Sequence, residues 1–322
     1  MTISRDGPAM PQSPARMGMG MGRGNAVHMA LPLLFVALYG SGFVGAKLGL
    51  PHAPPLTFLA LRFAIAAGVV ALIALALRAP WPSTWRDAAH IGIAGGLTVG
   101  TFSVGVFVAL DLGLSPALSA LIIALQPILV AIGAQGMLGE RLAARQWLGL
   151  GLGLLGVGLV VGHKLELTAD HVTGLTVASL GLLGLSLGTL YQKRFCATMN
   201  VYSGGALQSL AALGLCLPFA LLLEDMRITW TADFAIALGY MSLGVSVGAL
   251  SLLYVMIRRG EVSRVASLFY FVPVSAAVVS FVVFGERIDL PVVAGIAVTA
   301  LGVIMVNRPP RRREGTPALS RC

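Results

Sequence analysis

Ten long apolar stretches divide the chain, and short polar segments separate them. The stretches cover residues 28–49, 56–78, 89–110, 116–138, 146–162, 174–193, 203–223, 234–257, 265–285 and 290–307. A helix needs about 20 apolar residues to cross the roughly 30 Å hydrocarbon core of a bilayer. Each stretch is continuously apolar and does not alternate with period two, so it predicts a helix and not a strand of a membrane barrel. The pattern predicts an all-α integral membrane protein with ten transmembrane helices.

Composition and motifs agree with that reading. Hydrophobic residues make up 57% of the 322 residues and charged residues only 11%, against about 25% charged in soluble domains. The three cysteines form no CxxC pair, so we expect neither a disulfide framework nor a metal site. The chain contains no GxxxxGK[ST] segment and hence no ATP-binding motor, and we expect no cofactor. No cluster of catalytic residue types stands out, so we expect no enzymatic activity.

The positive charges predict the orientation in the membrane. If the N-terminus lies inside, 17 of the 22 Lys and Arg residues fall in cytoplasmic segments, as the positive-inside rule requires. Both ends are then cytoplasmic, in a bacterial-type inner (plasma) membrane. Residues 1–27 have the composition of a disordered N-terminus, and residues 308–322 form a basic tail. The basic run at 311–313 favours contact with anionic lipid over nucleic-acid binding.

The two halves of the chain are similar to each other at an offset of 146 residues. Pro127 falls on Pro273, Gly139-Glu140-Arg141 on Gly285-Glu286-Arg287, and 11 of 46 positions are identical between 115–160 and 261–306. We therefore divide the chain into a first five-span repeat, 28–163, and a second, 174–307. Because five is odd, the second repeat enters the membrane from the opposite face. Two inverted repeats are typical of secondary transporters, which bind solute near mid-membrane between them.

Specific segments give the chain a family resemblance. They are the segment from Tyr39 to Val44 with Lys47, the pair Arg62-Phe63, and the segment from Ala124 to Arg141 with its echo from Pro273 to Arg287. These segments resemble the drug/metabolite transporter superfamily, specifically its EamA-type ten-span carriers. The resemblance implies an inner-membrane carrier that most often exports small metabolites, amino acids or drugs. It also implies that spans one, three, four, six, eight and nine line a central cavity. A multi-span membrane enzyme, a non-transporting membrane scaffold and a channel stay open as alternatives.

Polar and aromatic residues in or near these spans are the candidates for lining a solute cavity: Ser41, Lys47, Thr101, Gln126, Tyr191, Lys193, Tyr254 and Tyr270. Lys47 and Lys193 are repeat mates near span ends, where a lysine also reaches the interface by snorkelling. The aromatic residues also fit interface belts or packing. The expected partners are a small-molecule solute and the lipid bilayer, while proton coupling and a homodimer are left open.

A second set of residues is assigned to structure. Pro127 and Pro273 lie within spans at matched positions, where each removes a backbone hydrogen bond and predicts a hinge or kink. The expected structural charges are Arg62, Glu140, Arg141, Glu286 and Arg287. Arg62 lies inside span two and needs a polar partner there, for which structural pairing is favoured over solute contact. No span contains Asp or Glu.

Overall fold

The computed structural model describes residues 21–114, 119, 122–162, 171–260, 262–284 and 290–307, and every element in these ranges is helical. In chain order the elements are α1 (Met21–Gly40), α2 (Gly42–Gly49), η1 (Leu50–His52), α3 (Pro55–Ala76), α4 (Trp85–Gly95), η2 (Gly96–Thr101), α5 (Phe102–Asp111), α7 (Gln126–Leu138), α8 (Ala144–Gly162), α9 (His171–Phe195), α10 (Val201–Leu223), α11 (Ala232–Gly239), η3 (Tyr240–Ala249), α12 (Leu250–Arg259), α13 (Val262–Ala266), η4 (Ser267–Tyr270), α14 (Phe271–Phe284) and α15 (Leu290–Asn307). The all-α membrane class is therefore confirmed.

Six helical segments of the described chain are long and apolar enough to cross a membrane. They are Leu31–His52, Pro55–Ala76, Trp85–Asp111, Val172–Phe195, Val201–Leu223 and Ala232–Arg259. The other four predicted spans contain α7, α8, α14 and α15. Each predicted span thus holds at least one helix, while the total of ten crossings stays a prediction. Large apolar side chains such as Leu72 and Leu222 are mostly exposed, as expected for a surface that faces lipid.

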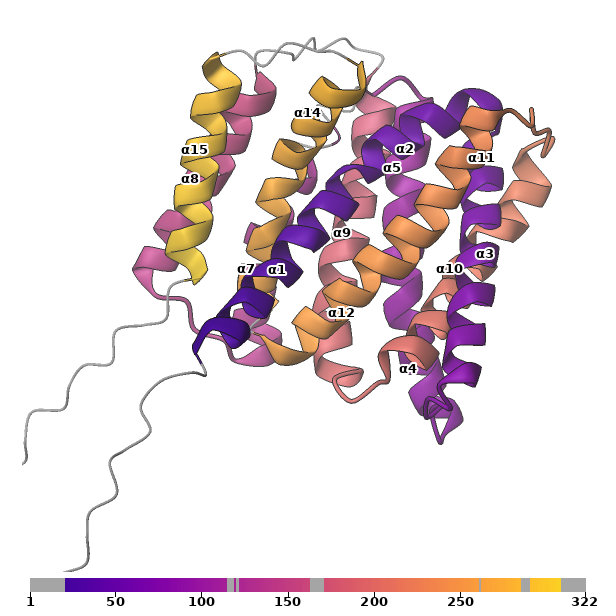
Figure 1. Cartoon of the computed structure of the whole chain (residues 1–322), viewed down its shortest axis with the longest axis horizontal. Helices are drawn as coiled ribbons and strands as arrows, with labels where there is room; N and C mark the ends of the chain where they lie inside the picture. The colour runs from indigo at the N-terminus through magenta and orange to yellow at the C-terminus, as the bar shows by residue number, and fades with distance from the viewer. Residues whose placement is uncertain are drawn as a thin grey trace, which may run out of the picture.

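The helices pack in a pattern that relates the two halves. Helix α3 packs along α10 at one side of the bundle, and α8 packs along α15 at the other, so spans two and seven meet, as do spans five and ten (Figure 1). Helix α1 contacts η3 and α14, whereas its repeat mate α9 contacts η2, α5 and α7. The first span of each repeat therefore packs against the third and fourth spans of the other repeat. These contacts join the two repeats into one bundle.

Irregular turns also recur at matched positions. The π-helical segments η2 and η3 widen spans three and eight, and the 146-residue offset carries η2 onto 242–247, inside η3. Spans four and nine each change helical form just before their proline. Helix α7 begins with Pro127 in its first turn, and the 3₁₀ turn η4 precedes α14, which holds Pro273. Proline fits the first turn of a helix because no hydrogen bond is lost there.

Glycines bring α8 and α15 into backbone contact. A Cβ atom added to Gly302 would lie 2.5 Å from the backbone nitrogen of Gly153 and 2.6 Å from the carbonyl oxygen of Gly149. Nothing in that contact can move aside, because both neighbouring atoms are backbone. Close approach of this kind is how small residues hold membrane helices together.

Candidate functional site

A pocket lies where the first three spans meet span eight. Its walls come from α1 and α2, from Arg62 of α3, from η2 and α5, and from η3 and α12. The empty space among these side chains, open mouth included, is about 500 Å³. Small-molecule sites are mostly apolar with a few polar groups, and the wall of this pocket has the same character. Both repeats contribute to this pocket, and both π-helical segments lie in its wall.

Aromatic rings form one wall of the pocket. Tyr39 and Phe102 stack with ring centroids 6.2 Å apart, and Phe107 stacks on Phe58 at 5.5 Å. Behind Tyr39, Phe269 of span nine makes an edge-to-face contact at 5.2 Å. Offset and edge-to-face contacts fix the orientation of each ring. The wall is therefore apolar, and its rings are held in fixed orientations.

Arg62 is the charged residue of the pocket wall. Its side chain is only 5% exposed. The Nε–H donates to Ser246 Oγ at 2.8 Å, and Cζ lies 5.2 Å from the ring centroid of Phe63. Neither partner carries a negative charge. Among the described residues we find a salt bridge between Arg227 and Asp225, which lies at the surface. No described carboxylate pairs with Arg62.

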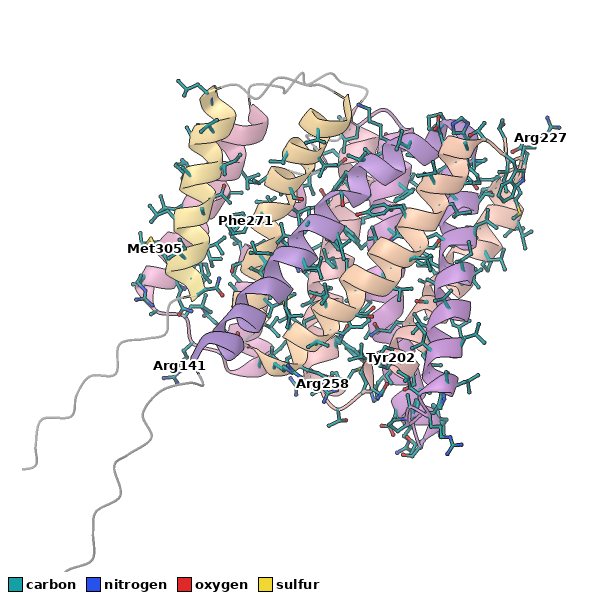
Figure 2. All side chains as sticks on the ribbon, viewed as in Figure 1. Arg141, Tyr202, Arg227, Arg258, Phe271 and Met305 are labelled. Atoms are coloured by element: carbon teal, nitrogen blue, oxygen red, sulfur yellow. The ribbon has the colours of Figure 1, made fainter. Side chains whose placement is uncertain are left out.

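One end of the bundle carries several arginines and is held together by side-chain contacts. We call it the basic end: Arg141 and Arg258 lie there, whereas Arg227 lies at the opposite end (Figure 2). At the basic end the Glu140 carboxylate, just after α7, accepts hydrogen bonds from Val262 N at 2.9 Å, Ser263 N at 3.3 Å and Ser263 Oγ at 2.8 Å. Span four is thereby fastened to the start of span nine.

Three cationic side chains form further contacts at the basic end. Lys193 Nζ donates to the carbonyl oxygens of Ile257 and Gly260, both at 2.8 Å, at the end of α12. Cations stabilise helix C-termini, where the last carbonyls lack partners. Arg194 donates to the carbonyl oxygen of Met137, and Arg258 to that of Met199. Spans four, six, eight and nine thus converge at this end.

The opposite end has a similar carboxylate clamp on other helices. Glu224, after α10, accepts hydrogen bonds from Leu56 N at 2.8 Å and from Thr57 N and Oγ1, both at 2.7 Å. These groups form the first turn of α3, where backbone N–H groups lack helical partners. The clamp joins spans two and seven, which pack together along their length.

Most sequence candidates for the cavity have other neighbours in the structure. Ser41 bonds to the Tyr240 hydroxyl and to backbone carbonyls, and Thr101 Oγ1 donates to the Gly96 carbonyl oxygen inside η2. Tyr191 OH lies 2.5 Å from His90 Nδ1. The wall of the 500 Å³ pocket includes none of these residues. Their role in transport stays a prediction.

The remaining cavity candidates divide between buried and exposed positions. Tyr254 and Tyr270 are buried, and Tyr270 OH donates to the Leu150 carbonyl oxygen at 2.9 Å. Lys47 is exposed on α2. Gln126 is fully buried, and neither its Oε1 nor its Nε2 has a hydrogen-bond partner in the described structure. An orphaned buried amide is costly, so Gln126 is the polar group of this set that most needs a ligand.

The expected structural charges are placed only in part. Glu140 binds the start of α13, and Arg141 is exposed at the basic end. Glu286 and Arg287 lie outside the described residues. Arg62 lies in the pocket wall beside Ser246.

Sequence reasoning missed the part that η2 and η3 play in the pocket. It assigned no role to Ser246, Val99 or Met241, because small and apolar residues inside a span give no signal of their own. Arg62 did carry a signal, since a charge inside a membrane span is a functional hypothesis by default. Structural pairing of Arg62 stays a prediction: its Nε–H has a protein partner in Ser246, and its described neighbours include no acid.

Comparisons with known proteins agree with the two-repeat organisation. A family model described as the EamA-like transporter family matches residues 27–162 and 172–308. The uncharacterized transporter YvbV of Bacillus subtilis is 27% identical over 86% of this chain and 91% of its own. A probable amino-acid metabolite efflux pump of Salmonella typhimurium is 27% identical over 85% and 92%.

Two further matches concern location and fold. The uncharacterized inner membrane transporter YedA of Escherichia coli K12 is 24% identical over 86% of this chain and 89% of its own. A solved crystal structure superposes with a TM-score of 0.74 at 22% identity, over 88% of this chain and 96% of the other. At that identity the superposition shows the shared fold alone.

Proposed function

Because this chain belongs to the EamA-like transporter family, we propose that it is a secondary transporter that exports a small solute across the inner membrane by alternating access. The pocket carries the proposal. It lies between elements of both repeats and has an apolar wall with one cation, and side-chain contacts join the helices at the basic end. The name of the Salmonella relative points to amino-acid metabolites as the first solutes to test.

The basic end is the proposed cytoplasmic face. Arg141, Arg194 and Arg258 gather there, and cytoplasmic segments of membrane proteins are rich in Lys and Arg. With that assignment the structure represents a state closed toward the cytoplasm. A reporter that fluoresces only in the cytoplasm, fused after residue 322, should be active. A reporter inserted beside Arg227 should be inactive, and the opposite pattern would refute the orientation.

Transport proceeds in this proposal when the contacts at the basic end open and the pocket faces the cytoplasm. Gln126 supports a pathway in span four, because its buried amide has no partner in the described structure. Lys47, Thr101, Tyr191, Lys193, Tyr254 and Tyr270 remain proposed pathway residues. Pro127 and Pro273 mark where spans four and nine change helical form, and bending there would open one end at a time.

Counterflow in proteoliposomes tests the function. Purified protein is reconstituted, the vesicles are loaded with unlabelled solute, and entry of labelled solute is followed for a panel of amino acids, nucleosides and cationic drugs. A carrier gives saturable entry that preloading accelerates, whereas a channel gives neither. Repeating the assay with and without an imposed pH gradient identifies proton coupling. If no member of the panel enters faster than into protein-free vesicles, the proposal fails.

A further inference from the structure

We propose that the solute of this carrier is an organic carboxylate with a flat apolar body, and that Arg62 binds its carboxylate group. This inference rests on the proposed carrier function and names the solute class for the same pocket. It starts from an imbalance of charge. Arg62 is 95% buried inside a membrane helix and has no negatively charged partner among the described residues. An unpaired cation at that depth is unfavourable.

The interiors of the apolar stretches hold no acid that could neutralise Arg62. None of the ten stretches contains Asp or Glu, and Asp87, Asp111 and Asp233 lie at or just beyond their ends. Glu224 lies after α10, and its two oxygens are occupied by Leu56 and Thr57 at the first turn of α3. Arg62 is seven residues after Pro55, where α3 begins, which places it about 10 Å deeper along the helix. The missing negative charge is therefore expected from a ligand.

The guanidinium group has donors left for that ligand. It carries five N–H groups, and the described structure uses only the Nε–H, for Ser246 Oγ. Neither terminal nitrogen of Arg62 is a buried atom that lacks a hydrogen-bond partner. Arg62 also borders the pocket. Arginine binds carboxylates with two parallel N–H bonds. Ser246 fixes the Nε side, which leaves the terminal nitrogens for the ligand.

The rest of the pocket defines the body of the solute. Apart from the cation, the wall includes Tyr39, Phe102, Phe107 and aliphatic groups such as Val245. None of the described residues that line this pocket is acidic, so these residues do not favour an amine on the ligand. A planar or compact apolar group attached to a carboxylate matches both the charge and the surface.

Matched pairs of compounds test the inference. Counterflow is measured for phenylacetate against phenylacetamide, indole-3-acetate against indole-3-acetamide, and L-phenylalanine against L-phenylalaninamide, in phosphatidylcholine vesicles with and without phosphatidylglycerol. The acid of at least one pair should be transported at least tenfold faster than its amide. If anionic lipid instead supplies the counterion, phosphatidylglycerol should suppress the acid and spare the amide, which would overturn the solute assignment.

Variants assign the effect to Arg62. Arg62→Gln should lower transport of the acid at least tenfold, whereas the matched control Arg86→Gln, an exposed arginine stacked on Trp85, should stay within twofold. Because Arg62→Gln could also impair folding, Ser246→Asp provides a second test. Its carboxylate would reach the same guanidinium from the position of Ser246 Oγ. It should abolish preference for the acid and keep or improve transport of the amide.

The outcomes separate this inference from the carrier function. Transport of only neutral or cationic solutes would overturn the anion site and leave the carrier standing. An acid that raises the melting temperature of wild-type protein but not of Ser246→Asp, without any transport, would support the site and overturn the carrier. Unchanged selectivity in Ser246→Asp, or no response to any acid in either assay, would overturn the inference.

Discussion

Replacing Glu140 with glutamine removes the negative charge that fastens span four to span nine at the basic end. The carboxylate accepts three hydrogen bonds there, at 2.9, 3.3 and 2.8 Å. Glutamine keeps one acceptor oxygen and brings an N–H₂ group that faces other donors. Hydrogen bonds to a charged group contribute about 1.5–3 kcal/mol each when buried, and a charge at a helix N-terminus adds about 0.3–1 kcal/mol.

The net loss should be about 2 kcal/mol, because Glu140 is half-buried and the glutamine retains part of the contact. A difference of 1.4 kcal/mol changes a population about tenfold. The open form of the basic end should therefore rise roughly 10- to 30-fold. A cysteine at Ala134, fully buried on α7 close to this end, reports the opening through its rate of reaction with a maleimide in protein that lacks the native cysteines.

Glu224→Gln is the matched control. Glu224 has the same three-bond geometry on the first turn of α3, at the opposite end of the bundle. Glu224→Gln should lower the melting temperature about as much as Glu140→Gln does. It should leave the labelling rate of the cysteine at position 134 unchanged. If Glu140→Gln leaves the labelling rate within twofold of the unmodified protein, or if Glu224→Gln raises it equally, the Glu140 contact does not hold the basic end closed.

Further predictions concern stability and reactivity. Gly302→Ala should lower the melting temperature through overpacking of about 1–3 kcal/mol, since its Cβ would meet α8 backbone; Gly158→Ala, with nothing within 4 Å, should not. Burial, and then the nearby Asp87 charge, raise the pKa of the Cys196 thiol to about 11. Only the thiolate reacts, so maleimide labelling should be slow at pH 7.5 and rise about tenfold per pH unit; rapid labelling at pH 7.5 would contradict this. Lys193→Met should destabilise the purified protein by about 1–3 kcal/mol through two lost carbonyl contacts, and an unchanged melting temperature would show those contacts to be unimportant.

The sequence predicted the helices well because lipid leaves the backbone few choices. Every unpaired N–H or C=O group in hydrocarbon is costly, so a continuous apolar run of about 20 residues has to be helical. The internal repeat carried further information. It matched Pro127 with Pro273, and the structure shows a change of helical form before both. The inverted orientation of the repeats and the exact span boundaries stay predictions.

The pocket was harder to predict, because its position depends on how helices from both halves meet. Single residues such as Thr101 and Tyr191 were selected for their polarity, yet each bonds to a near neighbour in the structure. Polarity alone does not distinguish a group that binds solute from one that is satisfied locally. Arg62 differs because the ten apolar stretches contain no acid to neutralise it. Counting charges of both signs inside the stretches would have singled out Arg62 as a candidate.

The wide turns of η2 and η3 have a consequence for how the chain tolerates change in length. A π turn holds more residues than an α turn, so a deletion of one residue from 240–249 would restore regular α-helical spacing. In a regular α-helix the loss of one residue rotates everything beyond it by about 100°. In span eight the return from wide to regular turns offsets much of that rotation, so Leu250 and the rest of α12 keep a similar direction. Span eight should therefore tolerate the loss of one residue from 240–249 better than a span built of regular α turns, such as α10.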